Sequence, residues 1–398
     1  MRSIASADVI VVNTCAVKGP TENRMIEILR RVPRRKKLIV TGCLPLVNFE
    51  RLQKEVLFSG VVGPAAGQRI VEIVNRVSNG EEVVVLANGA DNLPSLSLPR
   101  ARSSPVTSIV PINYGCLGSC AYCCVVFARG HLRSYDVQDI VKRVREDLDL
   151  GLREFWITSQ DTACYGRDKG TNLAALLRAL CCVEENFRIR VGMMTVNNVL
   201  DMQEELVQAF QDERIFKFIH LPVQSGDDDV LKRMRRFYRV EDFRRVVEAF
   251  RTSFPDITLA TDVICGFPGE TEEDFHRTLQ LIDEVKPDVV NISKFFARPK
   301  TAAARMQRDS VPLSEIKARS TVASALAKKL SFENNQRWAG WTGEILVDEV
   351  GKVPGSWVGR NLAYKPVAVK STSKLVGKFM HARITEAFPT YLQGSIIQ

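Results

Sequence analysis

Apolar and polar positions follow two different periods along the chain, and the changes between them mark its elements. In the first 92 residues, strand-like runs at 8–13 and 38–41 alternate with amphipathic stretches at 20–31 and 68–77. A period of two residues predicts strands, and apolar residues three to four apart predict helices. The segment 1–92 therefore predicts a small N-terminal α/β sandwich.

The pattern changes twice further along the chain. Residues 93–108 have no apolar periodicity and are rich in proline and serine, which predicts a linker. Between 109 and 334, strand-like runs alternate with helical patterns, as is typical of parallel strands joined by crossover helices. The runs lie near Ile109, Phe155, Ile189, Phe216, Thr258 and Val289. We expect an open six-stranded (β/α) partial barrel with its chemistry at the carboxyl ends of the strands.

The last block, residues 337–398, consists of short strand-like runs separated by glycine and proline, which predicts a small β-barrel. Lysine and arginine outnumber aspartate and glutamate in this block, and tryptophan and tyrosine are interleaved with them. Positive charge combined with stackable rings suits RNA. We therefore expect this block to be an RNA-binding domain.

Composition and charge narrow the class of protein. The 398 residues are 45% hydrophobic, which suits a globular chain of several domains, and the net charge of +9 is what a polyanion-binding surface produces. Basic runs at 30–37 and 232–239 are the kind most often found on solvated helix faces, although they could also track an RNA backbone. No apolar run is long enough to span a membrane and no export signal is present, so we expect a cytoplasmic monomer without membrane contact.

The strongest chemical signal is a loop of three cysteines, Cys116, Cys120 and Cys123, directly after the first predicted barrel strand. Ten cysteines in a chain without an export signal favour metal ligation over disulfides. Three thiolates at this spacing can bind three irons of a 4Fe-4S cluster and leave the fourth iron open for the amino and carboxylate groups of S-adenosylmethionine (SAM). A zinc site is the alternative, but no fourth ligand lies nearby. Cys124 could replace Cys123 as a ligand, but we expect it to be a packed neighbour.

A second cysteine signal lies in the first segment, where Cys15 and Cys43 each follow a predicted strand. The carboxyl ends of neighbouring parallel strands meet at one edge of a sheet, so these thiols would approach each other and suit a shared cluster. The other cysteines are expected to be small buried hydrophobes, although Cys164 and Cys265 are also formal candidates for a ligand from the barrel. They are Cys164, Cys265, Cys181 and Cys182.

Polar residues stand at the expected mouth of the partial barrel. Gln160, Gln224 and Asp262 lie at predicted strand ends, where they could bond the ribose and methionine parts of SAM, and Tyr122 in the cysteine loop is a further candidate. Any of them can equally be an ordinary hydrogen-bonded surface residue.

The cysteine loop resembles the CxxxCxxC motif of radical SAM enzymes, and the motifs around it resemble those of methylthiotransferases. These motifs lie at 127–130 with 133–134, 158–162 with 165–166, 220–226, 262–271, and 296–299 with Thr301. The block 337–398 resembles the TRAM domain of tRNA-modifying enzymes. Residues 13–22 are most similar to the archaeal and eukaryotic branch, which acts on N6-threonylcarbamoyladenosine.

The resemblance implies a tRNA methylthiotransferase that uses SAM twice. One SAM would methylate a sulfide on an auxiliary 4Fe-4S cluster, and a second would be cleaved to a 5′-deoxyadenosyl radical at the cluster held by Cys116, Cys120 and Cys123. The radical would take hydrogen from C2 of adenosine 37 in the tRNA anticodon loop, where the methylthio group then attaches. A ferredoxin or flavodoxin would donate the electron.

The resemblance also implies that Cys15 and Cys43 are two of three ligands of the auxiliary cluster. The family places the third after an earlier strand, and this chain begins directly ahead of what would be the second. We therefore expect a truncated N-terminal domain, with a native start before Met1, a ligand from elsewhere, or no auxiliary cluster. Two other hypotheses stay open: a radical SAM enzyme with a single cluster that methylates or sulfurates, and a catalytically inactive tRNA-binding module.

Overall fold

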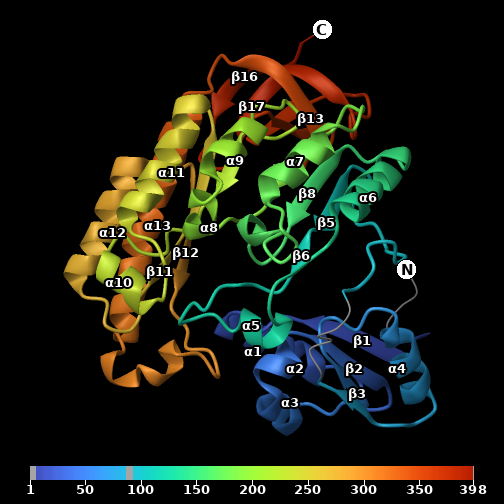
Figure 1. The fold of residues 1–398 in the computed structure, drawn as a ribbon. Helices are drawn as coiled ribbons and strands as arrows, with labels where there is room; N and C mark the ends of the chain where they lie inside the picture. Colours follow the sequence, from blue (N-terminus) through green and yellow to red (C-terminus); the bar gives the residue numbers. More distant parts are fainter. Residues whose placement is uncertain (1–5, 87–92, 398) are drawn as a thin grey trace. The chain divides into compact units, whose positions relative to one another are not determined.

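A computed structural model describes residues 6–86 and 93–397 (Figure 1). The chain forms two compact units. The first comprises Met1–Arg100, Tyr114–Arg133 and Phe296–Arg308, and the second comprises Ala101–Asn113, Ser134–Phe295 and Asp309–Gln398. Each unit has its own hydrophobic core.

The first unit is built on a parallel sheet with the strand order β1-β2-β3-β4. Its elements are β1 (Val9–Thr14), α1 (Gly19–Arg30), β2 (Lys37–Gly42), α2 (Leu44–Val47), α3 (Phe49–Glu55), β3 (Gly60–Val62), α4 (Arg69–Ser78), β4 (Val83–Val85), α5 (Val125–Arg129) and η3 (Ala303–Arg305). Alternate residues of β2 point to opposite faces. Leu38 and Val40 belong to a core with α1 and α3, whereas Ile39 packs with Ile73 and Val77 of α4. The sheet is therefore covered on both faces, as parallel sheets usually are.

The second unit contains the alternating strands and helices that the sequence predicts. Its elements before the C-terminal block are β5 (Thr107–Pro111), α6 (Val137–Asp149), β8 (Glu154–Thr158), η2 (Thr162–Cys164), α7 (Leu173–Cys181), β9 (Arg188–Val191), α8 (Val196–Leu200), α9 (Gln203–Ala209), β10 (Phe218–His220), α10 (Asp228–Arg233), α11 (Val240–Ser253), β11 (Thr258–Cys265), α12 (Glu272–Val285), β12 (Val289–Lys294) and α13 (Leu313–Gln336). Three short elements lie where the chain passes between the units: β6 (Asn113–Tyr114), β7 (Arg133–Ser134) and η4 (Gln307–Asp309).

The strands of the second unit run parallel in two groups, β5-β8-β9 and β10-β11-β12. Parallel bridges between Ile189 and Ile215 and between Met193 and His220 connect the groups. The predicted open six-stranded partial barrel is therefore confirmed. Gln160 and Gln224 lie in the loops that follow β8 and β10, whereas Asp262 lies within β11 and not at its end, because this strand continues to Cys265.

The C-terminal block forms a closed barrel with the strand order β13-β14-β15-β17-β16, which confirms the predicted small β-barrel. Its strands are β13 (Thr342–Val350), β14 (Ser356–Asn361), β15 (Pro366–Lys370), β16 (Phe379–Ala387) and β17 (Leu392–Ile396). The interior is filled by Trp338, Ile345, Val347, Val367 and Ile384. Among the helices of the described ranges, none has the length and apolar character needed to cross a bilayer.

The turn between β14 and β15 fastens this barrel to the amino ends of the partial-barrel strands. The Lys217 amide donates to the Leu362 carbonyl at 2.7 Å, just before β10. Buried Lys365 donates from Nζ to Oδ1 of Asp288 at 2.7 Å, just before β12. The Tyr364 ring packs 4.8 Å from the ring of Phe216. The C-terminal barrel and the partial barrel therefore share one compact unit.

Candidate functional site

The loop between β6 and α5 holds Cys116, Cys120 and Cys123, all of them half-buried. Gly118 lies between the first two sulfurs. A Cβ added to Gly118 would stand 3.3 Å from Sγ of Cys116 and 3.6 Å from Sγ of Cys120. Glycine therefore keeps free the space into which these two thiols point.

Backbone amides of the same loop donate hydrogen bonds to the sulfurs. The Gly118 N–H donates to Sγ of Cys116 at 3.1 Å, and the Val125 N–H donates to Sγ of Cys123 at 3.5 Å. Burial raises the pKa of Cys123 to about 12, against the effect of the Val125 amide. The free thiol is therefore protonated at neutral pH, and a metal would have to displace its proton. Hydrogen bonds of this kind also tune the potential of iron–sulfur clusters.

Two further contacts hold the cysteine loop in place. Gly115 has a φ of +78°, and a Cβ there would lie 2.1 Å from the carbonyl oxygen of His131, so only glycine fits. This close approach lets the Cys116 amide donate to the Gly130 carbonyl at 3.3 Å. On the other side, the Ala303 amide donates to the Ala121 carbonyl at 2.8 Å. The loop is thus held by segments just after it and far after it in the sequence.

The aromatic ring of Tyr114, one residue before this loop, lies against two arginines. The guanidinium carbons of Arg129 and Arg133 are 4.8 and 5.3 Å from the ring centroid. Burial raises the pKa of the Tyr114 hydroxyl. The motif at 127–134 therefore places two positive charges beside the start of the cysteine loop, where they would offset part of the negative charge of a thiolate-bound cluster.

The donor set fits a cluster better than a single metal ion. Within residues 6–86 and 93–397, no three His, Cys, Asp or Glu side chains are placed to bind one metal ion together. A 4Fe-4S cluster does not need that arrangement, because each thiolate binds a different iron. Two thiols beside the space at Gly118 and a third in the same loop, with amides directed at the sulfurs of Cys116 and Cys123, fit a cluster with one open iron.

The ends of β1 and β2 bring Cys15 and Cys43 to the same edge of the sheet. The Cys43 amide donates to the Thr14 carbonyl at 2.9 Å. Gly42 has a φ of +97°, and a Cβ there would stand 2.2 Å from the Thr14 oxygen, so the contact requires glycine. Cys15 is exposed and Cys43 is buried.

The remaining cysteines divide into packed and exposed ones. Cys124 is buried, and its Sγ donates to the Ala16 carbonyl at 3.6 Å, which confirms that it is a packed neighbour. Cys164 and Cys265 are also buried, as expected. The prediction that Cys181 and Cys182 belong to the core is wrong, because Cys181 is half-buried and Cys182 is exposed. The reason is that α7 ends at Cys181, so Cys182 caps the helix and leaves its buried face.

The structure adds a buried ion pair that the sequence did not indicate. The Glu22 carboxylate accepts a hydrogen bond from Nη2 of Arg298, and both side chains are almost fully buried. Arg51 and Asn48 donate to the same carboxylate at 2.8 Å each. Burial opposes the charge of Glu22, but the hydrogen bonds from Arg298 and Arg51 outweigh it and lower the pKa. Arg298 lies just before η3, and Ala303 of η3 contacts the cysteine loop. The ion pair therefore connects this segment to helix α1.

In the second unit, Gln224 and Asp262 come together through the backbone. The Gln224 amide donates to the Asp262 carbonyl at 2.8 Å, and the Ile264 amide donates to the Gln224 carbonyl at 3.0 Å. Gln224 is buried with a φ of +71°, a conformation that costs a residue other than glycine about 1–3 kcal/mol. Strained conformations of this kind gather at functional sites, where the surrounding structure holds them.

The carboxylate of Asp262 joins three strands. Its Oδ1 contacts Nε2 of His220 at 2.9 Å and accepts from Nδ2 of Asn291 at 2.8 Å. His220 ends β10, Asp262 lies within β11, and Asn291 lies within β12. The sequence singled out Asp262 but missed this partnership with Asn291, because residues of separate strands show no shared local pattern.

Gln160 is half-buried in the loop after β8, next to a residue with a clear structural role. The buried carboxylate of Asp161 accepts from the amides of Ala163 at 3.1 Å and Thr195 at 3.0 Å. It also accepts from Nδ2 of Asn198 at 2.7 Å. Asp161 therefore fixes the loop that carries Gln160 to the loop after β9. Tyr122 is half-buried within the cysteine loop of the first unit.

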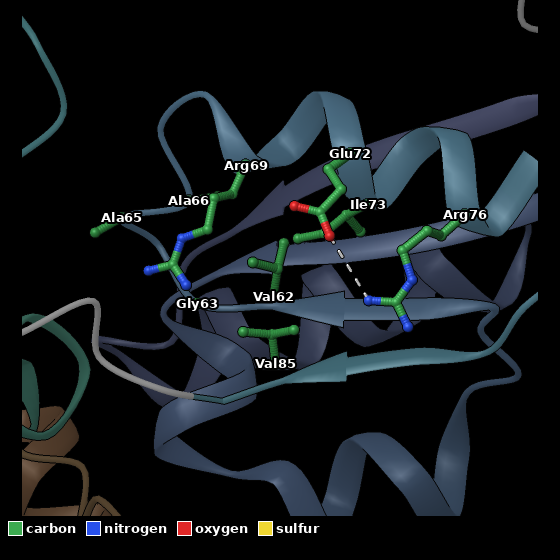
Figure 2. Close-up of a pocket in the computed structure, with 9 residues that line it drawn as sticks. All are labelled: Val62, Gly63, Ala65, Ala66, Arg69, Glu72, Ile73, Arg76 and Val85. Carbon is green, nitrogen blue, oxygen red and sulfur yellow. Dashed lines mark ion pairs between the residues drawn. The ribbon is translucent and has the colours of Figure 1, made fainter.

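A small cavity of about 180 Å³ lies elsewhere in the first unit, between α4 and the sheet (Figure 2). Arg69, Glu72 and Arg76 line it from the helix, across from Val62 and Val85 of the strands. None of the predicted cofactor residues contributes to its wall. The cavity is therefore separate from the cysteine loop and from Cys15 and Cys43.

Comparison with known families assigns models to most of the chain. The model described as Radical SAM superfamily matches residues 110–282, the TRAM domain matches 336–397, and Uncharacterized protein family UPF0004 matches 1–63. Among similar structures, a radical S-adenosylmethionine methyltransferase, TsrM from Kitasatospora setae, has a TM-score of 0.59 at 14% identity and covers 93% of this chain and 71% of its own. At that identity the likeness concerns the fold alone.

Curated relatives match the chain over nearly its whole length. A probable threonylcarbamoyladenosine tRNA methylthiotransferase of Pyrococcus abyssi is 42% identical, over 98% of this chain and 91% of its own length. Threonylcarbamoyladenosine tRNA methylthiotransferases of Xenopus laevis and Homo sapiens are 36% and 35% identical, each over 98% of this chain. The matched parts make up 71% and 68% of those two proteins.

Proposed function

The chain belongs to the threonylcarbamoyladenosine tRNA methylthiotransferase family of radical SAM enzymes, and from that premise we propose that it converts N6-threonylcarbamoyladenosine at position 37 of tRNA to its 2-methylthio derivative. Family membership confirms the resemblance that the cysteine loop and its surrounding motifs indicated. It implies a 4Fe-4S cluster and SAM as cofactors and tRNA as the substrate.

Cys116, Cys120 and Cys123 would hold the cluster that the radical SAM family requires. When bound and reduced, such a cluster supplies the electron that cleaves SAM to methionine and a 5′-deoxyadenosyl radical. The amides of Gly118 and Val125 orient two of the sulfurs, and the missing side chain of Gly118 leaves room beside them. The loop contacts of Gly115 and Ala303 keep this arrangement in place before any cofactor binds.

The polar groups of the partial barrel would bind SAM. Gln224 and Asp262 are joined through the backbone, and His220 and Asn291 hold the Asp262 carboxylate in one orientation. A carboxylate fixed in this way can accept hydrogen bonds from both hydroxyls of a ribose. Gln160, anchored through its neighbour Asp161, would offer an amide to the same ligand. The observation that carries the proposal is the combination of the three-cysteine loop with full-length relatives that modify tRNA.

Cys15 and Cys43 would bind a second cluster, which supplies the sulfur. The support is the close contact of their strand ends at Gly42 and Thr14, which places both cysteines at one edge of the sheet. Iron content tests this point: after reconstitution we expect about eight irons per chain, and about four in a Cys15→Ala/Cys43→Ala variant. About four irons in both proteins would refute the second cluster and leave a single-cluster enzyme.

Cleavage of SAM tests the first cluster directly. The reconstituted chain is reduced under anaerobic conditions, and 5′-deoxyadenosine is measured together with the cluster absorbance. Wild type should release 5′-deoxyadenosine, whereas Cys120→Ala should release none and should lose about half of the cluster absorbance, the part that belongs to the first cluster. The matched control is Cys182→Ala, which removes an exposed cysteine at the end of α7 and should behave like wild type. Cleavage by Cys120→Ala, or none by wild type, would contradict the proposal. The reductant, the oligomeric state and the cellular location stay predictions.

A further inference from the structure

The segment between α10 and α11 carries an exposed aromatic residue within a run of basic residues. Phe237 is 71% exposed, whereas its neighbour Tyr238 is buried. Lys232, Arg235 and Arg239 of the same stretch are also exposed. Within the described parts of the chain, neither Lys232 nor Arg235 forms an ion pair, so both cations are available to a ligand.

The backbone of this segment is strained at Arg235. Its φ is +56°, and the amides of Arg235 and Arg236 donate back to the carbonyls of Lys232 at 3.0 Å and Leu231 at 2.9 Å. This pair of hydrogen bonds forms a helix end that normally has glycine at the left-handed position. Arginine there costs conformational energy that glycine would avoid. Stability alone does not explain an arginine at this position, whereas binding of its guanidinium to a ligand would explain it.

The neighbours of Phe237 hold the segment rigidly to the loop that carries Gln224. The Tyr238 hydroxyl lies 3.0 Å from the Pro222 carbonyl oxygen and 2.8 Å from that of Val223. Nε of Arg236 donates to the Tyr238 hydroxyl at 3.1 Å. Phe237 thus projects from a fixed base, and that base is continuous with a loop proposed to bind SAM.

We propose that residues 232–239 form a second RNA contact, in which an unpaired base of the tRNA stacks on Phe237 and adjacent phosphates bind Lys232 and Arg235. An exposed ring among free cations is the combination with which proteins bind single-stranded nucleic acid, because every base has a face that can stack. Unpaired bases in RNA lie in loops, and the proposed substrate nucleotide is in such a loop. The inference rests on the proposed function and adds a place where the loop is held.

The test measures binding of the full-length chain to an anticodon stem-loop RNA by fluorescence anisotropy at several salt concentrations. Loss of one stacked base lowers affinity by about fivefold to 150-fold, and we expect Phe237→Ala to fall in this range. Phe237→Trp should retain affinity, because it keeps a stacking surface. A fully paired RNA duplex of the same length should bind Phe237→Ala and wild type equally.

Arg235→Gly separates RNA binding from a structural role. Glycine relieves the strained conformation, so the thermal midpoint should stay the same or rise, while RNA affinity falls and the salt slope drops by about 0.7 for one lost phosphate. The matched control is Arg245→Ala on α11, whose side chain is 61% exposed but already paired with Asp242. It should bind RNA like wild type.

The outcomes distinguish this inference from the proposed function. If wild type binds the stem-loop but Phe237→Ala and Arg235→Gly bind it within twofold of wild type, the second contact is wrong and the methylthiotransferase assignment is unaffected. If wild type does not bind the stem-loop, both fail together.

Discussion

Replacing Glu22 with glutamine is expected to destabilise the first unit by about 3 kcal/mol. The side chain of Glu22 is 1% exposed and that of Arg298 is 6% exposed, so the substitution leaves a buried guanidinium without its counter-charge. Breaking a buried ion pair in this way costs about 3–5 kcal/mol. Glutamine still accepts hydrogen bonds from Arg51 and Asn48, which places the expected cost at the low end of that range.

The same pair predicts a dependence on pH. The folded state lowers the pKa of Glu22, so its contribution to stability is present above the ordinary carboxyl pKa and is lost as the pH falls through the lowered value. In Glu22→Gln, the glutamine side chain does not titrate over the acidic pH range in which Glu22 gains its proton. The difference in unfolding free energy between wild type and the variant should therefore shrink as the solution becomes more acidic.

Hydrogen exchange measured by mass spectrometry is the suitable assay, because it reports on peptides of α1 and α3 separately from the second unit. All four tryptophans lie in the second unit, so their fluorescence serves as a control that should not change. Glu27→Gln is the matched variant, since its ion pair with Arg31 is exposed and should matter by less than about 0.5 kcal/mol. Equal protection of α1 in wild type and Glu22→Gln would refute the role of the pair.

Two further predictions concern other close contacts. Gly42→Ala should lower the iron content from about eight to about four per chain, because a Cβ would stand 2.2 Å from the Thr14 oxygen and separate the strand ends that carry Cys15 and Cys43; unchanged iron would contradict this. Lys365→Ala should release the C-terminal barrel to limited proteolysis, because it leaves the buried carboxylate of Asp288 without its nearest cation at a cost of about 3–5 kcal/mol. Digestion at the wild-type rate would argue against this fastening.

Features that depend on local sequence could be predicted. The alternation of strand-like runs with helical patterns located the strands of the partial barrel, and the spacing of Cys116, Cys120 and Cys123 predicted a cluster site without any tertiary information. Strands β3 (Gly60–Val62) and β4 (Val83–Val85) were missed, because three residues are too few to establish a period.

Features that depend on distant contacts could not be predicted. Glu22 and Arg298 are 276 residues apart, and nothing in either local pattern indicates the other. The Asp262 carboxylate meets Asn291 only because β11 and β12 pair in the sheet. The exposure of Cys182 depends on the residue at which α7 ends, and helix ends are the least predictable part of an element.

Mass spectrometry of tRNA nucleosides shows whether the chain methylthiolates tRNA. The gene is expressed in cells that contain N6-threonylcarbamoyladenosine but lack its methylthio derivative, and digested tRNA is analysed. We expect wild type to produce the 2-methylthio nucleoside, Cys182→Ala to do the same, and Cys120→Ala to produce none. Absence of the nucleoside with wild type, or its appearance with Cys120→Ala, would contradict the claim that the Cys116, Cys120 and Cys123 loop drives methylthiolation of tRNA.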